Sequence, residues 1–395
     1  MDRPTKHESG FSLLEMTIAT ALGTLVLGAA LQLYSQGVAA TWTVSQRAEM
    51  QQDFRAASNV LTRDMSLAGA GLPNAAAIAL PTAVTPVYGC DQSSCYLGLA
   101  NNTGATYPKQ GTTPYLYGLI PGYNGGPTVS SPPGQTDVIT VVYTDTAFYL
   151  NCYAPTITAK GVVTFAPPVT VPATPWPPPG CLPSNVTPQN GVAPQNLNDA
   201  VIGLTPGDLV LMTFNNSTIV AEVTGAVTTS SANTFVVPFS NTDALHMNQT
   251  GSGATAGLNS VALNAVGAAT AAPCGRTGPC RIFVITYYID NTVSPPRLMR
   301  QVSGHTPMPV AENVVYLHFS YDLFNDSTNT PYVGVADGGA SEGLRPNQIT
   351  KINIVNMDID SSQYGAQYGQ NGYQRLDLHT SVSARNLTYV NNYPQ

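Results

Sequence analysis

The sequence predicts an α+β protein: a long N-terminal α-helix, transmembrane and then amphipathic, packs on an antiparallel β-rich globular domain with disulfide-stapled loops. Three observations lead to this prediction. An apolar run extends from Phe11 to Tyr34. After residue 70, strand-like runs follow one another without helical segments between them, which disfavours a parallel α/β sheet. The six cysteines fall into three pairs that are close in sequence.

The apolar run is long enough to cross a membrane. Its 24 residues would form a helix about 36 Å long, whereas a hydrocarbon core is about 30 Å thick. Glu15 is the one charged side chain in it. A carboxylate in lipid is costly, so Glu15 either reaches the headgroups or awaits a cationic partner. Arg3 and Lys6 precede the run and would hold this end in the cytoplasm by the positive-inside rule.

Beyond Tyr34 the helical pattern continues but becomes amphipathic. Apolar residues recur at helical spacing at Phe54, Ala57, Leu61 and Ala68. Glycines and a proline from residue 69 onward end the helix near residue 67. We therefore expect a leader at 1–10, a helix over 11–68 and a β-rich domain over 69–395. The charged residues expected on the other helix faces are Arg47, Glu49, Asp53, Arg55, Arg63 and Asp64.

The β-rich domain is expected to begin with long loops and short strands over 74–135. Residues 153–200 contain a proline-rich stretch and are interpreted as a surface excursion. Pro238 suggests that its strand lies at a sheet edge. The expected strands are 137–143, 207–214, 218–224, 234–239, 281–289, 297–300, 314–324, 349–359 and 375–387.

The cysteine pattern favours disulfides in an oxidising compartment, because an even number of cysteines follows an export segment. Six cysteines allow fifteen connectivities. Pairing of sequence neighbours closes short loops and is favoured. Metal binding is the alternative, but it would need closer cysteine spacing or nearby histidines. The favoured pairs are Cys90 with Cys95, Cys152 with Cys181, and Cys274 with Cys280.

Composition and motifs point away from nucleic-acid binding and from catalysis. The net charge is −7, and only 9% of residues are charged. The sequence contains no run of Lys or Arg, and phosphate binding needs clustered cations, which leaves only a patch formed in three dimensions. The common hydrolase, metalloprotease, phosphate-loop and dinucleotide motifs are also missing. We expect no catalytic residue, no cofactor and no metal.

A few polar residues leave alternatives open. Asp358 and Asp360 lie two apart on an expected strand, where they could help to bind Ca²⁺ or be solvated surface carboxylates, the more common case. Histidines at 318 and 379 are expected to be surface or hydrogen-bonded residues of strands. The tyrosines at 364, 368 and 373 lie in a stretch rich in Gly and Gln. A flexible loop is the favoured interpretation of this stretch, and an adhesive patch is the alternative.

The segment Gly10-Phe11-Ser12-Leu13-Leu14-Glu15-Met16-Thr17-Ile18-Ala19 resembles the class III signal of type IV pilins and type II secretion pseudopilins. The resemblance implies that a prepilin peptidase cuts between Gly10 and Phe11 and methylates the new N-terminus. It also implies that Glu15 neutralises the N-terminal amine of an adjacent subunit during assembly. Pairing of a buried carboxylate with a buried ammonium lowers the cost of both.

A weaker resemblance points to PilW-like minor pilins. It rests on 137–143, 206–211, 285–289 before 297–300, and the closing Ser383-Ala384-Arg385-Asn386-Leu387. The closing residues are also similar to those of J-type pseudopilins, but this chain is longer and carries extra cysteine-bearing loops.

The expected function is that of a minor pilin in pilus assembly initiation or at the fibre tip. The alternatives are a J-type pseudopilin and a pilus-borne adhesin. The implied partners are the prepilin peptidase, other major and minor pilins, the inner-membrane assembly platform and membrane lipid, with no nucleic acid. The implied location is the inner membrane, single-pass with a cytoplasmic N-terminus, and then the fibre at the cell surface.

Overall fold

The computed structural model describes residues 12–73, 77–97, 104–130, 133–145, 147–166, 197–214, 217–231, 234–249, 258, 278–360, 372 and 375–387. The predicted cleavage junction Gly10–Phe11 lies outside these residues. So do Cys181, Cys274 and the tyrosines at 364, 368 and 373.

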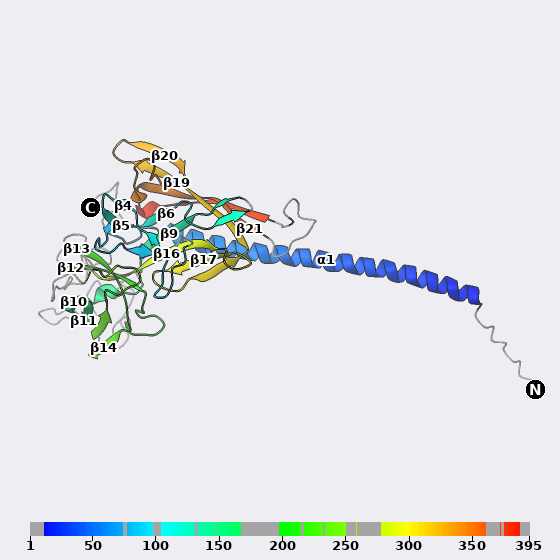
Figure 1. Cartoon of the computed structure of the whole chain (residues 1–395), viewed down its shortest axis with the longest axis horizontal. Helices are drawn as coiled ribbons and strands as arrows, with labels where there is room; N and C mark the ends of the chain where they lie inside the picture. The colour runs from blue at the N-terminus through cyan, green and yellow to red at the C-terminus, as the bar shows by residue number, and fades with distance from the viewer. Residues whose placement is uncertain are drawn as a thin grey trace, which may run out of the picture.

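One long helix, α1 (Leu13–Ser66), precedes a large antiparallel β domain, which confirms the predicted α+β class. Its 54 residues span about 80 Å. The N-terminal half projects away from the β domain, and the C-terminal half lies against it (Figure 1). Ala57 and Leu61 are fully buried there, as the amphipathic pattern predicted, and so is Met65. Asp64 was expected on a face other than the apolar one but is 4% exposed, because its carboxylate is paired inside the domain.

The largest sheet is antiparallel and is organised around β16 (Cys280–Asp290). β16 pairs with β9 (Val138–Thr144) on one side. On the other side, β12 (Leu209–Phe214) pairs with its beginning and β17 (Arg297–Val302) with its end. The remaining strands are β6 (Leu119–Gly122), β13 (Ser217–Glu222) and β18 (Met308–Glu312). The predicted strands 207–214 and 218–224 are confirmed and form a hairpin, as do the predicted strands 281–289 and 297–300.

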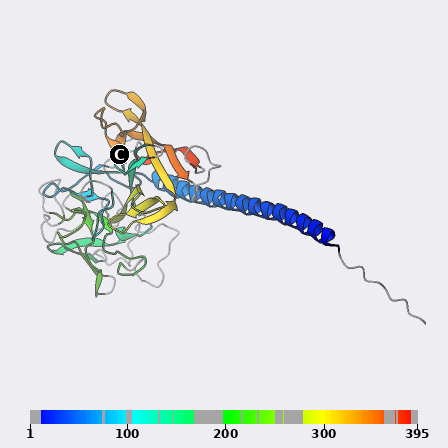
Figure 2. The ribbon, with the colours of Figure 1, turned by 45° about the vertical axis from the view of Figure 1, so that its right-hand side comes forward.

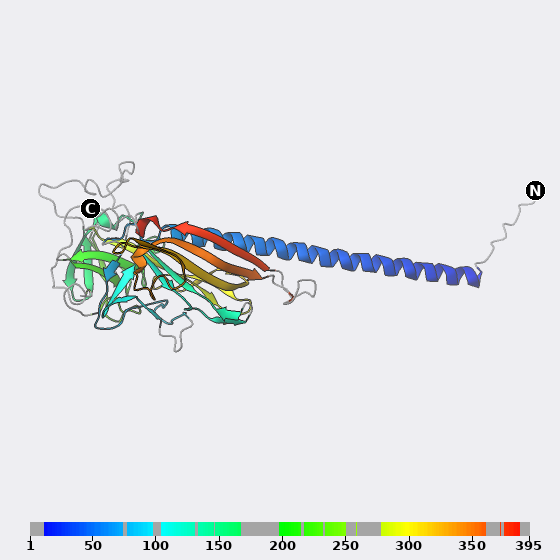
Figure 3. The same cartoon turned by 90° about the horizontal axis from the view of Figure 1, so that it is seen from above.

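A second sheet lies beside the C-terminal half of α1. Its order is β20-β19-β21-β22, with β19 at Val314–Asn325, β20 at Thr330–Val335, β21 at Ile349–Asp360 and β22 at Arg375–Ser383. α1 contacts β21 and β22 of this sheet and β18 of the largest sheet. β22 and β21 run alongside the helix when the molecule is seen from above (Figure 3). Leu317, Phe319 and Tyr321 lie two residues apart in the predicted strand 314–324, a spacing that predicts one shared face, and all three are buried.

A third sheet, β10-β11-β15-β14, forms the end of the domain farthest from the start of α1 (Figures 1 and 2). Its strands are β10 (Ala154–Ala159), β11 (Val162–Ala166), β14 (Thr228–Ser231) and β15 (Thr234–Pro238). Together with residues of β12 and β13, it forms a second apolar cluster. Two predictions were wrong here. The described start of the 153–200 excursion is a hairpin that buries Ile157 and Phe165. β15 is an inner strand, because Pro238 is only its last residue.

The early part of the β domain consists of short strands, as predicted. They are β1 (Ala77–Ala79), β2 (Val87–Tyr88), β3 (Ala105–Thr106), β4 (Lys109–Gln110), β5 (Thr113–Tyr117), β7 (Thr128–Ser130) and β8 (Pro133–Gln135). Two short 3₁₀ turns lie at Leu150–Cys152 and Pro346–Gln348.

The predicted Cys90–Cys95 disulfide is present. Cys152 and Cys280 are also disulfide-bonded. Because Cys181 and Cys274 lie outside the described residues, the two predicted pairings that involve them stay predictions.

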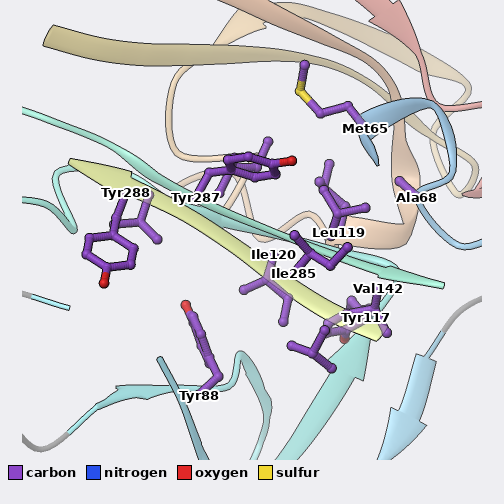
Figure 4. Close-up of a cluster of buried hydrophobic side chains, with 14 of the residues drawn as sticks. Met65, Ala68, Tyr88, Tyr117, Leu119, Ile120, Val142, Ile285, Tyr287 and Tyr288 are labelled. Carbon is purple, nitrogen blue, oxygen red and sulfur yellow. The ribbon is translucent and has the colours of Figure 1, made fainter. Parts of the chain in front are cut away.

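The end of α1 enters the core of the large sheet. Met65 and Ala68 lie above β9 and β16, close to Leu119, Val142 and Tyr287 (Figure 4). The chain then passes very close to β6. A Cβ atom at Gly118 would lie 2.6 Å from the Cα of Gly69, so a side chain at position 118 would displace the helix exit.

Candidate functional site

The start of α1 is closed by a reciprocal cap. Ser12 is the N-cap residue, and its Oγ accepts a hydrogen bond from the backbone N–H of Leu14 at 3.3 Å. The backbone N–H of Ser12 donates in turn to Oε2 of Glu15 at 3.1 Å. The Ser-x-x-Glu spacing is the signature of a capping box, a signal in the sequence that our expectations for Glu15 did not use. The carboxylate is therefore held at the positive end of the helix dipole.

After this cap, α1 presents apolar side chains to its surroundings on every side. The large apolar residues from Leu13 to Tyr34 are between 51% and 82% exposed. α1 is the one helix in the described part of the chain that is long and apolar enough to span a membrane, and it lies near the N-terminus. This is consistent with a membrane anchor. The residues concerned are Leu13, Leu14, Met16, Ile18, Leu22, Leu25, Val26, Leu27, Leu31, Leu33 and Tyr34.

The hydroxyl groups in this half of the helix are satisfied internally. Thr17 donates to the carbonyl of Leu14 at 2.8 Å, and Thr20 to that of Met16 at 2.9 Å. Thr24 donates to the backbone in the same manner. A threonine whose hydroxyl is bonded to the preceding turn exposes little unmet polarity. These residues therefore do not prevent burial in lipid, where unsatisfied polar groups cost several kcal/mol.

The uncharged part of α1 is longer than a membrane requires. Arg47 is the first Asp, Glu, Lys or Arg after Glu15. The 31 residues from Met16 to Gln46 correspond to about 46 Å of helix, against about 30 Å of hydrocarbon. Tyr34 and Trp42, which are 72% and 58% exposed, lie in the outer part of this stretch. Aromatic residues of this kind favour membrane–water interfaces.

The far half of α1 is anchored by a buried ion pair. Oδ2 of Asp64 accepts hydrogen bonds from Arg300 Nε at 2.8 Å and from the hydroxyl of Tyr287 at 2.6 Å. Arg300 and Tyr287 face each other from the paired strands β17 and β16. Burial, followed by the Asp64 charge, raises the pKa of Tyr287, so its hydroxyl stays a hydrogen-bond donor. The helix is thereby held in one position on the large sheet.

The polar residues considered from sequence do not converge on one site. Asp360 binds Arg375 in a bidentate pair, at 2.7 Å from Nε and 3.0 Å from Nη2. Asp358 is buried beside the same guanidinium and was wrongly expected to be a solvated surface carboxylate. Within the described ranges, no group of three or more His, Cys, Asp or Glu residues could hold a metal ion. His318 lies on β19 with its Nδ1 2.7 Å from Asp137 Oδ2, as expected for a paired strand histidine.

The notable feature of the chain is therefore α1 itself: a capped, exposed, apolar half followed by a half that is fixed to the β domain. Comparison of the chain with models of protein families, with curated proteins and with solved structures found no match.

Proposed function

We propose that this protein is a minor subunit of a type IV pilus-like fibre, which acts in assembly initiation or at the fibre tip. One observation carries the proposal: the apolar half of α1 is exposed along its whole length and holds its single carboxylate, Glu15, at the N-terminal end. The resemblance of the segment around Gly10 and Phe11 to a class III signal supports it. The membrane would hold the apolar half before assembly, and neighbouring helices would cover it in the fibre.

The proposed mechanism is assembly and not catalysis. Cleavage after Gly10 would create an amine on Phe11, and Glu15 would then be the fifth residue of the cleaved chain. In the described structure this carboxylate already accepts the N–H of Ser12. A second acceptor oxygen is left to receive the amine of an adjacent subunit, and a buried ammonium is a strong partner for a buried carboxylate.

The first test is the mass and N-terminal sequence of the protein made with and without an active prepilin peptidase. With the peptidase, we expect a product that starts at methylated Phe11. A Gly10→Leu variant should stay uncleaved, whereas Gly28→Ala, a control in the same helix, should be processed normally. A product that retains Met1 in the presence of the peptidase, or one cut well beyond residue 30, would contradict the proposal.

The second test separates the charge of Glu15 from its capping role. Glutamine also serves in a capping box, so Glu15→Gln removes the charge and preserves the helix start. We expect this variant to be cleaved and inserted in the membrane but lost from sheared fibres. Ser12→Ala, which weakens the cap and keeps the charge, should still be found in fibres. Normal incorporation of Glu15→Gln would show that the charge is not needed.

A type II secretion pseudopilin is the alternative that shares the same helix chemistry. The length of the chain and its additional cysteine-bearing loops favour the minor pilin. Deletion of the gene would distinguish them: loss of surface fibres supports a pilus, and loss of exoprotein secretion with fibres intact supports a pseudopilin.

A further inference from the structure

A buried carboxylate, Glu222, lies in the β domain and takes no part in the proposed assembly mechanism. It is the last residue of β13 and is 1% exposed. Its Oε2 accepts the backbone N–H of Leu245 at 2.8 Å. The side chain of Asn248 bonds to both backbone groups of Glu222, accepting from its N–H at 2.9 Å and donating to its carbonyl at 2.7 Å. Glu222 is thus the attachment point for the segment 240–249.

The segment 240–249, which we name the clasp, is held by its own buried acid as well. Asp243 accepts the backbone N–H groups of Met247 and Asn248 and an amide hydrogen of Gln249. The clasp then supports the chain that leads to the Cys90–Cys95 disulfide. The N–H of Val87 in β2 donates to the carbonyl of Leu245 at 3.1 Å. The clasp therefore connects β13 to β2.

The surroundings of Glu222 disfavour a negative charge. Its Oε1 has no hydrogen-bond partner among the described residues. The backbone of Gly304 closes over this oxygen, because a Cβ atom there would lie 2.9 Å from it. Asp243 is the nearby like charge, and Tyr107 is a buried neutral neighbour. His305 is a favourable neighbour, but its ring is already paired with Asp208 at 3.0 Å.

These surroundings raise the pKa of Glu222 to about 7, with burial as the main cause and the Asp243 charge as a smaller one. The Leu245 N–H and His305 act in the opposite direction. The pKa of Glu222 in the closed clasp is above the usual value of 4.5. Closure is therefore most favourable below pH 4.5. It weakens as the pH rises through about 7.

We propose that the clasp is a pH-responsive element, closed on β13 and β2 when Glu222 is protonated and loosened when Glu222 is ionised. A neutral carboxyl group still accepts the Leu245 N–H and needs no countercharge at Oε1. An ionised one leaves a buried negative charge whose Oε1 receives no hydrogen bond from the described residues. The inference concerns only the β domain, so it holds whether or not α1 assembles into a fibre.

Hydrogen exchange of the full-length protein in detergent tests the proposal, read on peptides that cover 240–249. After correction for the intrinsic effect of pH on exchange, opening should increase about 30-fold between pH 5.5 and 8.5, as linkage gives for a pKa that moves from about 7 to about 4.5. Glu222→Gln should abolish this increase. Asp358→Asn, which alters a different buried carboxyl group, should leave it intact. Asp243→Asn removes the like charge and should move the midpoint to lower pH.

Two results would overturn the inference: a wild-type clasp whose corrected exchange does not depend on pH, or a dependence that persists in Glu222→Gln. Exchange of β16 peptides serves as the folding control. If Glu222→Gln perturbs β16, the Asp243→Asn variant provides the test instead, because its clasp exchange should have a lower pH midpoint than that of the wild type. An unchanged midpoint would contradict the inference.

Discussion

Substitution of Arg300 should weaken the attachment of α1 to the β domain more than substitution of an exposed charged residue. Arg300→Gln would leave Asp64, whose side chain is 5% exposed, with the hydroxyl of Tyr287 as its remaining partner at 2.6 Å. Loss of one member of a buried pair costs about 3–5 kcal/mol. Arg300 itself is 28% exposed, so water can partly replace it, and we expect about 2–3 kcal/mol.

A double-mutant cycle isolates this pair from the packing around it. Asp64→Asn combined with Arg300→Gln removes the uncompensated charge, so the double variant should be more stable than Arg300→Gln alone. Arg297→Gln is the matched control on the same strand. Its pair with Glu312 is 3.2 Å long and exposed, with side chains 36% and 52% accessible, and should contribute about 0–1 kcal/mol.

The assay is urea unfolding of the full-length protein in detergent, followed by near-ultraviolet circular dichroism, with hydrogen exchange of residues 50–66 as a local measure. Arg300→Gln should lower the urea midpoint and increase exchange in this part of α1. If it behaves like Arg297→Gln, or if the double variant is no more stable than Arg300→Gln, the ion pair does not anchor the helix.

Three further predictions concern the β domain. Gly118→Ala should destabilise it by about 1–3 kcal/mol, since the added Cβ would lie 2.6 Å from the backbone of the helix exit; an unchanged thermal midpoint would show that the exit can move. Burial, followed by the hydrogen bond and charge of Asp377, raises the pKa of Asp358 to about 7. Its stabilising contribution is therefore complete below pH 3.8 and lost as the pH rises through about 7, and Asp377→Asn should flatten the fall in urea midpoint between pH 5 and 8. The contact with Asp137 raises the pKa of His318. This pair therefore stabilises the fold below pH 6.5, and the stabilisation is lost as the pH rises above the pKa of the folded state. Nuclear magnetic resonance titration should give a pKa above 6.5 for His318, and a pKa at or below 6.5 would show that the pairing is absent in solution.

Local pattern was sufficient for the elements whose burial follows from their own periodicity. The 3.6-residue repeat predicted the buried face of α1 around Ala57 and Leu61. The two-residue alternation likewise predicted the core face of β19 at Phe319. The inference of an edge strand from Pro238 was wrong, because the position of a strand within a sheet depends on which other strands pair with it.

The sequence by itself determined that a helix long and apolar enough to cross a membrane precedes a β-rich domain. Whether a helix can lie in lipid depends on the amino-acid composition of one segment, which is read directly from the sequence. Only the tertiary structure decided the partners of the isolated acids. Asp64 meets Arg300 across 236 positions, and Glu222 meets Leu245 of the clasp across 23 positions that include the hairpin of β14 and β15. Charge pairing in a core depends on which strands become neighbours, and this follows from the packing of the whole domain and not from the spacing of residues.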